Sequence, residues 1–104
     1  KCEKFMALVA ENFKTQREIG FYADKLCLTP KYLSALSKEV CGYTVQELVF
    51  KSVIRKAISL LKNTQKSAQE ISNELNFPTP SYFGTFFKKQ TGLSPQQYRN
   101  SLQD

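Results

Sequence analysis

The stretch TPKYLSALSKEVCG, residues 29–42, is repeated fifty residues later as TPSYFGTFFKKQTG, residues 79–92. Residues 22–28, just before the first copy, also match residues 71–77, but with an offset of forty-nine. The extra residue of the second copy therefore falls in the turn between the two matching parts. A small helical unit cannot bury its apolar face alone, but two copies can pack and present two similar surfaces. The duplication predicts two copies of one binding device.

Each long copy carries the start and stop signals of a helix. Thr29 is a typical N-cap residue, and Pro30 takes the first helical position, where its missing N–H costs nothing. Gly42 is a typical helix stop. The second copy repeats these signals in Thr79, Pro80 and Gly92. The pattern predicts helices over 30–41 and 80–91, here called the reading helices. Each follows a short helix and a tight turn, which makes a helix-turn-helix.

Capping signatures and apolar spacing predict the other helices. Apolar residues at three- and four-residue steps mark a helix within 2–13 and a short one within 19–26. N-cap residues followed three positions later by Glu or Gln open three more, at Thr44 with Glu47, Ser67 with Glu70, and Ser94 with Gln97. No stretch shows the alternation of a strand, so the predicted fold is all-α, with about seven helices.

We expect one domain over residues 1–104 with three parts. A first helix-turn-helix subdomain covers 1–43, a long linking helix covers 44–62, and a second helix-turn-helix subdomain covers 63–104. The linking helix would span about 25 to 28 Å at 1.5 Å per residue. Together with the widths of the packed units, it would hold the reading helices about one DNA turn apart, roughly 34 Å.

The reading helices also predict where a partner binds. One face of each is apolar and is assigned to the core, at Leu33, Leu36, Val40, Phe83, Phe86 and Phe87. The opposite faces are small or cationic at matching positions. A helix fits the major groove of B-DNA, so we expect base-facing residues at Lys31, Ser34, Ala35, Ser81, Gly84 and Thr85. Lysines further along are assigned to phosphates, at Lys38, Lys88 and Lys89.

The composition favours an anionic partner over catalysis. The net charge of +6 comes from fifteen Lys and Arg against nine Asp and Glu. Histidine is absent, and no residue stands in a nucleophile or phosphate-loop motif, so we expect no enzyme activity, no metal and no cofactor. The cysteines, Cys2, Cys27 and Cys41, are odd in number and lack metal-ligand spacing. We expect all three to act as small apolar residues.

The chain shows no sign of membrane targeting. No apolar run is long enough to cross a bilayer, and the first residues lack a signal-peptide pattern. We therefore expect a cytoplasmic protein with no membrane partner. Because the chain begins at Lys1 and is already helix-like by Phe5, we expect it to be a fragment that lacks a preceding region.

Several short motifs surround the second copy: ISNELNF (71–77), SYF (81–83), FFKK (86–89), TGLSP (91–95) and Tyr98-Arg99. They resemble the DNA-binding domain of the AraC/XylS family of bacterial transcription regulators, over nearly the whole chain. Residues 22–34 are similar to family members from Bacteroides-like bacteria. The resemblance implies a sequence-specific regulator of double-stranded DNA, an activator that contacts RNA polymerase, behind an N-terminal sensor or dimerisation region. It also implies a phosphate contact by Arg99, for which a structural salt bridge is the alternative.

The chain departs from the family pattern in a turn and on the reading faces. Asn76 stands where the family usually has Gly, but Asn tolerates left-handed backbone, so we expect the turn to persist. Ser37 stands where Phe is frequent, which predicts a less apolar first subdomain. Members with strong base readout carry Arg or Gln where this chain has Ser34, Ala35, Ser81 and Thr85. The small side chains shift the expected readout toward phosphates, methyl groups and DNA shape.

Two other functions fit the same sequence. A helical protein-interaction module would use its basic faces on an acidic partner, and scattering of the cations over several faces would favour it. An accessory domain of a DNA-repair enzyme would carry Cys2 as the remnant of a reactive site. The lack of histidine and of metal-ligand spacing weighs against that second alternative.

Overall fold

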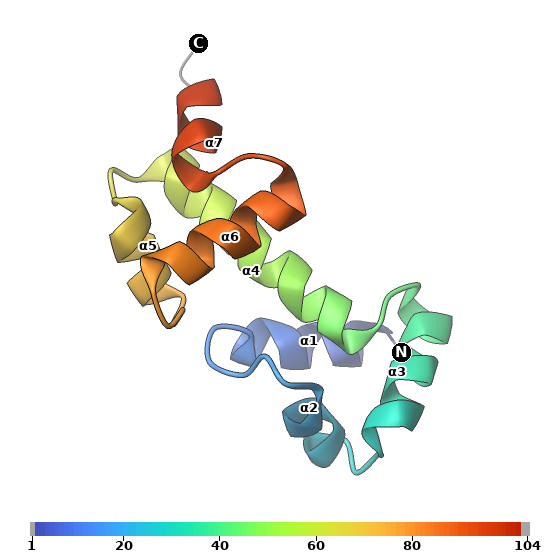
Figure 1. Cartoon of the computed structure of the whole chain (residues 1–104). Coiled ribbons are helices and arrows are strands. Elements are labelled where there is room, and N and C mark those ends of the chain that lie inside the picture. The colour runs from blue at the N-terminus through green and yellow to red at the C-terminus, as the bar shows by residue number, and fades with distance from the viewer. Residues whose placement is uncertain (1, 103–104) are drawn as a thin grey trace. The chain divides into compact units, whose positions relative to one another are not determined.

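The computed structural model describes residues 2–102, and within them it contains seven α-helices and no strand (Figure 1). The predicted all-α class and the predicted helix order are confirmed. No helix among these residues is long and apolar enough to cross a membrane. The helices are α1 (Cys2–Asn12), α2 (Ile19–Lys25), α3 (Pro30–Cys41), α4 (Val45–Asn63), α5 (Ala68–Glu74), α6 (Pro80–Thr91) and α7 (Pro95–Ser101).

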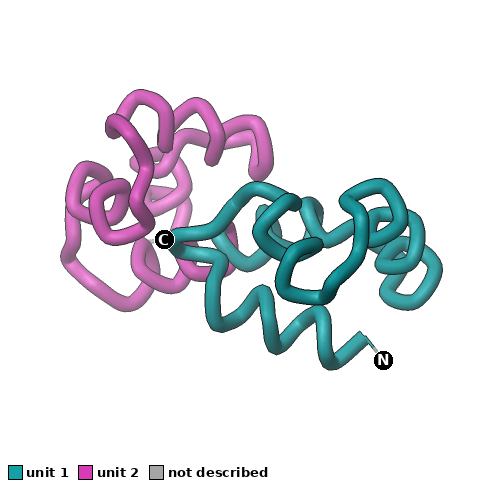
Figure 2. Tube along the Cα trace, turned by 90° about the horizontal axis from the view of Figure 1, so that it is seen from below, with its two compact units in different colours: residues 1–53 teal, residues 54–104 magenta. Residues whose placement is uncertain are grey.

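The chain forms two compact units, residues 1–53 and 54–104 (Figure 2). The division falls inside α4, between Val53 and Ile54, so the first half of this helix belongs to unit 1 and the second half to unit 2. The linking helix predicted over 44–62 corresponds to α4, and the three-part division stays a prediction. Each half of α4 supplies buried residues to its own unit.

Unit 1 packs α1, α2, α3 and the first half of α4 around one apolar core. Its buried apolar residues are Phe5, Val9, Tyr22, Ala23, Leu33, Val45, Leu48, Val49 and Val53. Fewer apolar residues of α1 are buried than its sequence pattern predicts, because Met6 remains 37% exposed. The Tyr22 hydroxyl donates to the Gln16 carbonyl at 2.6 Å, so the polar tip of this buried ring is satisfied.

A disulfide joins the start of α1 to the end of α3 in unit 1. Cys2 begins α1, Cys41 ends α3, and their Cα atoms lie 5.3 Å apart. The expectation that all three cysteines act as small apolar residues is therefore wrong for this pair. Cys27 is free and exposed. The bond closes a loop across 39 positions of sequence, so it ties a reading helix to the first helix of the unit.

Unit 2 is built around aromatic rings. Phe77 packs against Phe83 and Phe86, with ring centroids 5.0 Å and 5.4 Å apart. Phe87 lies 5.8 Å from Phe83 and meets Tyr98 edge to face at 5.5 Å. These contacts confirm that the predicted phenylalanine stripe of the second reading helix belongs to the core rather than to a base-stacking surface. Each such pair adds about 0.5 to 1.5 kcal/mol beyond area burial.

The predicted helix caps are present in hydrogen bonds. The hydroxyls of Thr29 and Thr79 accept the N–H of the third residue of α3 and α6, at 3.2 Å and 3.1 Å. The reading helices stop at Gly42 and Gly92, with φ of 81° and 90°, a left-handed conformation that glycine adopts without strain. Reciprocal capping boxes open α4, α5 and α7, at Thr44 with Glu47, Ser67 with Glu70, and Ser94 with Gln97.

Candidate nucleic-acid interface

The turns of the two helix-turn-helix motifs have the same backbone structure. Cys27 and Asn76 are the two non-glycine residues with positive φ among residues 2–102, at 57° and 62°. The next N–H reaches back five residues in both turns, from Leu28 to the Ala23 carbonyl at 2.9 Å and from Phe77 to the Ser72 carbonyl at 3.0 Å. This is the Schellman arrangement. The expectation that Asn76 keeps a left-handed turn is confirmed, and Cys27 does the same in unit 1.

The extra residue of the second motif follows its turn. Between the left-handed residue and the N-cap of the reading helix, the first motif has Leu28 alone, whereas the second has Phe77 and Pro78. Leu28 is half-buried and Phe77 is buried, while Pro78 is exposed. The apolar residue after the turn therefore anchors both motifs, and the insertion is accommodated at the surface.

The two reading helices expose the same positions. Over ten residues, 31–40 and 81–90, the order of exposed, intermediate and buried side chains is identical in nine. Leu33 and Phe83 are fully buried, as are Ser37 and Phe87 one turn later. All six predicted base-facing positions therefore share their exposure with the matching position of the other copy. The pairs are Lys31 and Ser81 (exposed), Ser34 and Gly84 (intermediate), and Ala35 and Thr85 (exposed).

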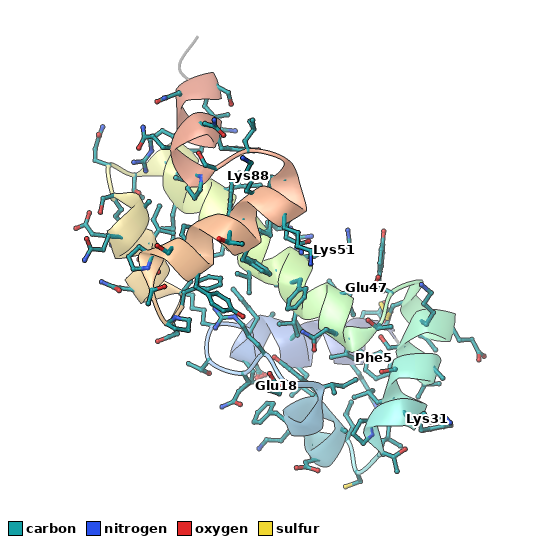
Figure 3. The ribbon with its side chains drawn as sticks, viewed as in Figure 1. Phe5, Glu18, Lys31, Glu47, Lys51 and Lys88 are labelled. Atoms are coloured by element: carbon teal, nitrogen blue, oxygen red, sulfur yellow. A yellow bond between two sulfur atoms is a disulfide. The ribbon has the colours of Figure 1, made fainter. Side chains whose placement is uncertain are left out.

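The lysines predicted to contact DNA, one toward bases (Lys31) and three toward phosphates (Lys38, Lys88 and Lys89), are all exposed on the reading helices. Lys31 and Lys38 are seven residues apart on α3, a spacing that places them on one face, and both are exposed. Lys88 and Lys89 are exposed in the last turn of α6. Figure 3 labels Lys31 on the first turn of α3 and Lys88 on α6. Each unit thus presents cations on its own reading helix.

Arg99 lies elsewhere. Its Nε donates to the Leu61 carbonyl at 3.1 Å, and its Nη2 donates to the carbonyls of Leu60 and Thr64 at 3.5 Å and 3.2 Å. These oxygens lie at and just beyond the C-terminal end of α4, where a cation is favourable, and the Leu60 carbonyl also accepts the Thr64 N–H at 3.2 Å. The structure gives Arg99 a capping contact between α7 and α4 rather than the salt bridge considered from sequence. The phosphate contact that the resemblance implies for Arg99 stays a prediction.

Buried serines support the start and the end of the reading helices. The Ser37 hydroxyl donates to the Tyr43 carbonyl at 2.7 Å, just after α3 ends. The Ser72 hydroxyl donates to the Thr79 carbonyl at 3.3 Å, just before α6 begins. Both side chains are fully buried. Ser37 stands where the family often has Phe. Because its buried hydroxyl is hydrogen-bonded, burying this polar side chain costs little stability.

Near the start of α4, the sequence predicted the capping box of Thr44 with Glu47 but not the contacts made there by Lys38 and Lys51. The Thr44 N–H donates to the Glu47 carboxylate at 2.9 Å, which lowers the pKa of Glu47 below its ordinary value of 4.5, with smaller contributions from Lys38 and Lys51. The Lys51 ammonium lies 4.5 Å from the centroid of the Tyr43 ring. Figure 3 labels Glu47 and Lys51 on α4. Glu47 and Lys51 are four residues apart on one helix, and this spacing could have predicted from sequence that their charges lie close together.

Comparison with known proteins places the chain among regulators. A family model described as a helix-turn-helix domain matches residues 22–101. The chain is 29% identical over 100 residues to the melibiose operon regulatory protein of Escherichia coli K12, covering 96% of this chain and 33% of that protein. It is 32% identical over 77 residues to the xylose operon regulatory protein of the same strain, covering 74% of this chain and 20% of that protein. The chain thus spans a third or less of these relatives.

Solved structures share the fold over almost the whole chain. The C-terminal domain of AraT, a response regulator from Geobacillus stearothermophilus, is 31% identical with a TM-score of 0.86, over 96% of this chain and 84% of that one. The C-terminal domain of the response regulator yesN from Fusobacterium nucleatum is also 31% identical with a TM-score of 0.86, over 93% and 95%. The DNA-binding domain of AdpA, solved with a target DNA, has a TM-score of 0.83 at 19% identity, over 96% and 90%, which shows the fold alone.

Proposed function

The chain belongs to the AraC/XylS family of transcription regulators, as a helix-turn-helix DNA-binding domain and not an enzyme, and we propose that it reads two successive major grooves with α3 and α6. The observation that carries this proposal is the matched exposure of the two reading helices behind turns of identical backbone structure. Because the two helix-turn-helix motifs have the same local structure, we expect each to make the same kind of contact with DNA.

Base contacts come from the first half of each reading helix. In a helix-turn-helix the N-terminal residues of the second helix meet base edges in the major groove. We assign this role to Lys31, Ser34, Ala35, Ser81, Gly84 and Thr85. Lys31 is the one long donor in this set, whereas the rest are small. Readout therefore depends on Lys31, on the Thr85 hydroxyl and methyl group, and on the shape of the DNA.

Phosphate contacts come from lysines near the ends of the reading helices. Lys38, Lys88 and Lys89 are exposed and lie two turns beyond the first base-facing positions. Phosphate contacts hold the protein on the duplex without reading its sequence. A net charge of +6 supplies this attraction.

The wider role follows from the relatives, whose names describe operon regulators. We propose that the full-length protein activates transcription in the cytoplasm, that it contacts RNA polymerase, and that a sensor or dimerisation region precedes residues 1–104. A Bacteroides-like origin rests on the resemblance of residues 22–34 alone.

Selection of bound sequences from a random duplex pool tests the proposal and yields the site. On the selected site, neutralisation of about five to eight phosphates should give a slope of log affinity against log salt near −5 to −7. Lys31→Ala should change the preferred sequence, whereas Lys88→Ala should weaken binding to specific and random duplexes alike. A slope near zero, or no enrichment of any sequence, contradicts the proposal.

A further inference from the structure

Tyr32 and Tyr82 form a matched pair of exposed aromatic residues that the proposed site does not yet use. They lie at the third position of α3 and α6 and are 56% and 59% exposed, more than the other large apolar side chains that reach the surface among residues 2–102. A single exposed ring is common on protein surfaces, but here the same position of both copies carries one. Its repetition points to a role shared by the two motifs.

The fold does not account for the phenol groups. The backbone N–H of each tyrosine donates to the N-cap threonine, but any residue with an N–H makes that bond. The centroid of the Tyr82 ring lies 6.1 Å from that of the Phe77 ring, but the residue remains 59% exposed. Within residues 2–102 neither hydroxyl forms a hydrogen bond. The fold therefore fixes the backbone of each tyrosine and leaves its hydroxyl available.

Helical geometry places these rings at the side of the reading face. Successive residues turn by about 100°, so Tyr82 lies about 60° from Thr85 on one side and about 100° from the buried Phe83 on the other. The same angles relate Tyr32 to Ala35 and Leu33. A helix in the major groove directs its outer face toward the bases and its sides toward the groove walls, which are made of phosphates.

We propose that Tyr32 and Tyr82 donate their hydroxyl groups to DNA phosphates at the walls of the two grooves. The inference rests on the proposed DNA-binding function and adds a neutral pair of contacts to its lysines. Tyrosine is among the side chains that bind phosphate oxygens in duplex DNA. The surroundings differ between the copies, because Lys89 lies seven residues after Tyr82 on the same side, whereas Glu39 takes that place after Tyr32. The contribution of Tyr82 should therefore be larger.

Tyr→Phe substitutions isolate the hydroxyl because they keep the ring and the helix cap. The expected loss of affinity of the 104-residue chain for its selected duplex is about 3- to 20-fold for Tyr82→Phe, and smaller for Tyr32→Phe. The salt slope should stay unchanged, because a phenol neutralises no phosphate charge. Lys88→Ala should instead reduce that slope by about one. Tyr43→Phe is the matched control, a 43% exposed phenol located after α3 ends.

A scan of the site with single methylphosphonate linkages identifies the phosphate. We expect one linkage beside each groove to weaken the parent chain but to have no further effect on the matching Tyr→Phe variant. Parent-like affinity of both Tyr→Phe variants overturns this inference and leaves the proposed function intact. An equal loss in Tyr43→Phe, or a loss seen with Tyr82→Ala but not with Tyr82→Phe, also overturns it. Failure of the parent chain to bind any duplex overturns the proposed function as well.

Discussion

The guanidinium of Arg99 in α7 donates to the carbonyl oxygen of Leu61 in α4, across 38 residues of sequence, with Nε and that oxygen 3.1 Å apart. Two further bonds from the same group reach Leu60 and Thr64. One side chain thus closes the C-terminal end of α4 and holds the last helix of unit 2 against it. A position that resembles a DNA-binding residue of the family has a structural role here.

Arg99→Met should destabilise the domain without changing how it binds DNA. Loss of the charged hydrogen bonds should lower the free energy of unfolding by about 1 to 3 kcal/mol, since the carbonyls of Leu61 and Thr64 lose the Arg99 donor. The salt slope of DNA binding should match that of the parent. Lys62→Met, which removes an exposed cation from the same end of α4, should change stability by less than about 0.5 kcal/mol. A salt slope reduced by about one in Arg99→Met shows instead that this residue neutralises a phosphate.

Removal of the Cys2–Cys41 disulfide should weaken unit 1. For a loop of 39 residues, the chain-entropy estimate of its contribution to the free energy of unfolding is about 4 kcal/mol. The double variant Cys2→Ser, Cys41→Ser should therefore melt at a lower temperature than the oxidised parent. Cys27→Ser serves as the control, because Cys27 is free. Equal melting of the double variant and the oxidised parent contradicts a stabilising bond.

The left-handed turns predict opposite effects of one substitution at two nearby sites. Asn76→Gly should raise the free energy of unfolding by about 0.5 to 1 kcal/mol, because a side chain at φ 62° carries a penalty that glycine avoids. Asn73→Gly, inside α5, should lower it by a few tenths of a kcal/mol, because glycine is the poorer helix former. Chemical denaturation of both variants measures the difference. Stabilisation by neither substitution contradicts a strained turn.

Stability should fall in acid because of two capping carboxylates. Backbone N–H bonds from Thr44 and Ser67 lower the pKa of Glu47 and Glu70 below 4.5. Their stabilisation is complete above the unfolded value near 4.5 and is lost as the pH falls below it, through the lowered folded values.

Replacing Glu47 and Glu70 by glutamine removes the titrating carboxylate but keeps a side chain that can make the capping hydrogen bond. Gln97 makes the same reciprocal capping contacts in α7, so glutamine is a fitting replacement. The double variant Glu47→Gln, Glu70→Gln should lose less stability than the parent between about pH 5 and pH 3. Parallel stability curves for the two proteins over this interval would mean that the carboxylates do not carry the effect.

Much of the fold was predictable because its signals are local. Proline at a helix start, threonine caps, capping boxes and glycine stops act within one turn, and the repeat shows each reading helix twice. The left-handed Asn76 followed from the resemblance to a family that usually has Gly at this turn. The disulfide did not follow, because the approach of Cys2 to Cys41 is set by packing of helices that are distant in sequence. The carbonyl contacts of Arg99 escaped for the same reason.

The sequence predicted which side of each reading helix is buried and which is exposed, but not the exposure of every side chain at the boundary. Helical periodicity separates buried Leu33 and Phe83 from exposed Lys31 and Thr85, and exposure in the structure agrees. Periodicity does not say whether an aromatic residue at the side of a helix is covered by a neighbour. The exposure of Tyr32 and Tyr82 therefore required the packed structure.

The central claim, that α3 and α6 occupy successive grooves together, is tested most directly by inserting two alanines between Val53 and Ile54. This point in α4 lies between the two compact units, so neither core is split. The insertion turns the second half of α4 by about 200° and lengthens it by about 3 Å. We expect cooperative melting and half-site affinities like those of the parent, with affinity for the full site lower by about 10² to 10⁴. Parent-like affinity for the full site contradicts the two-groove account.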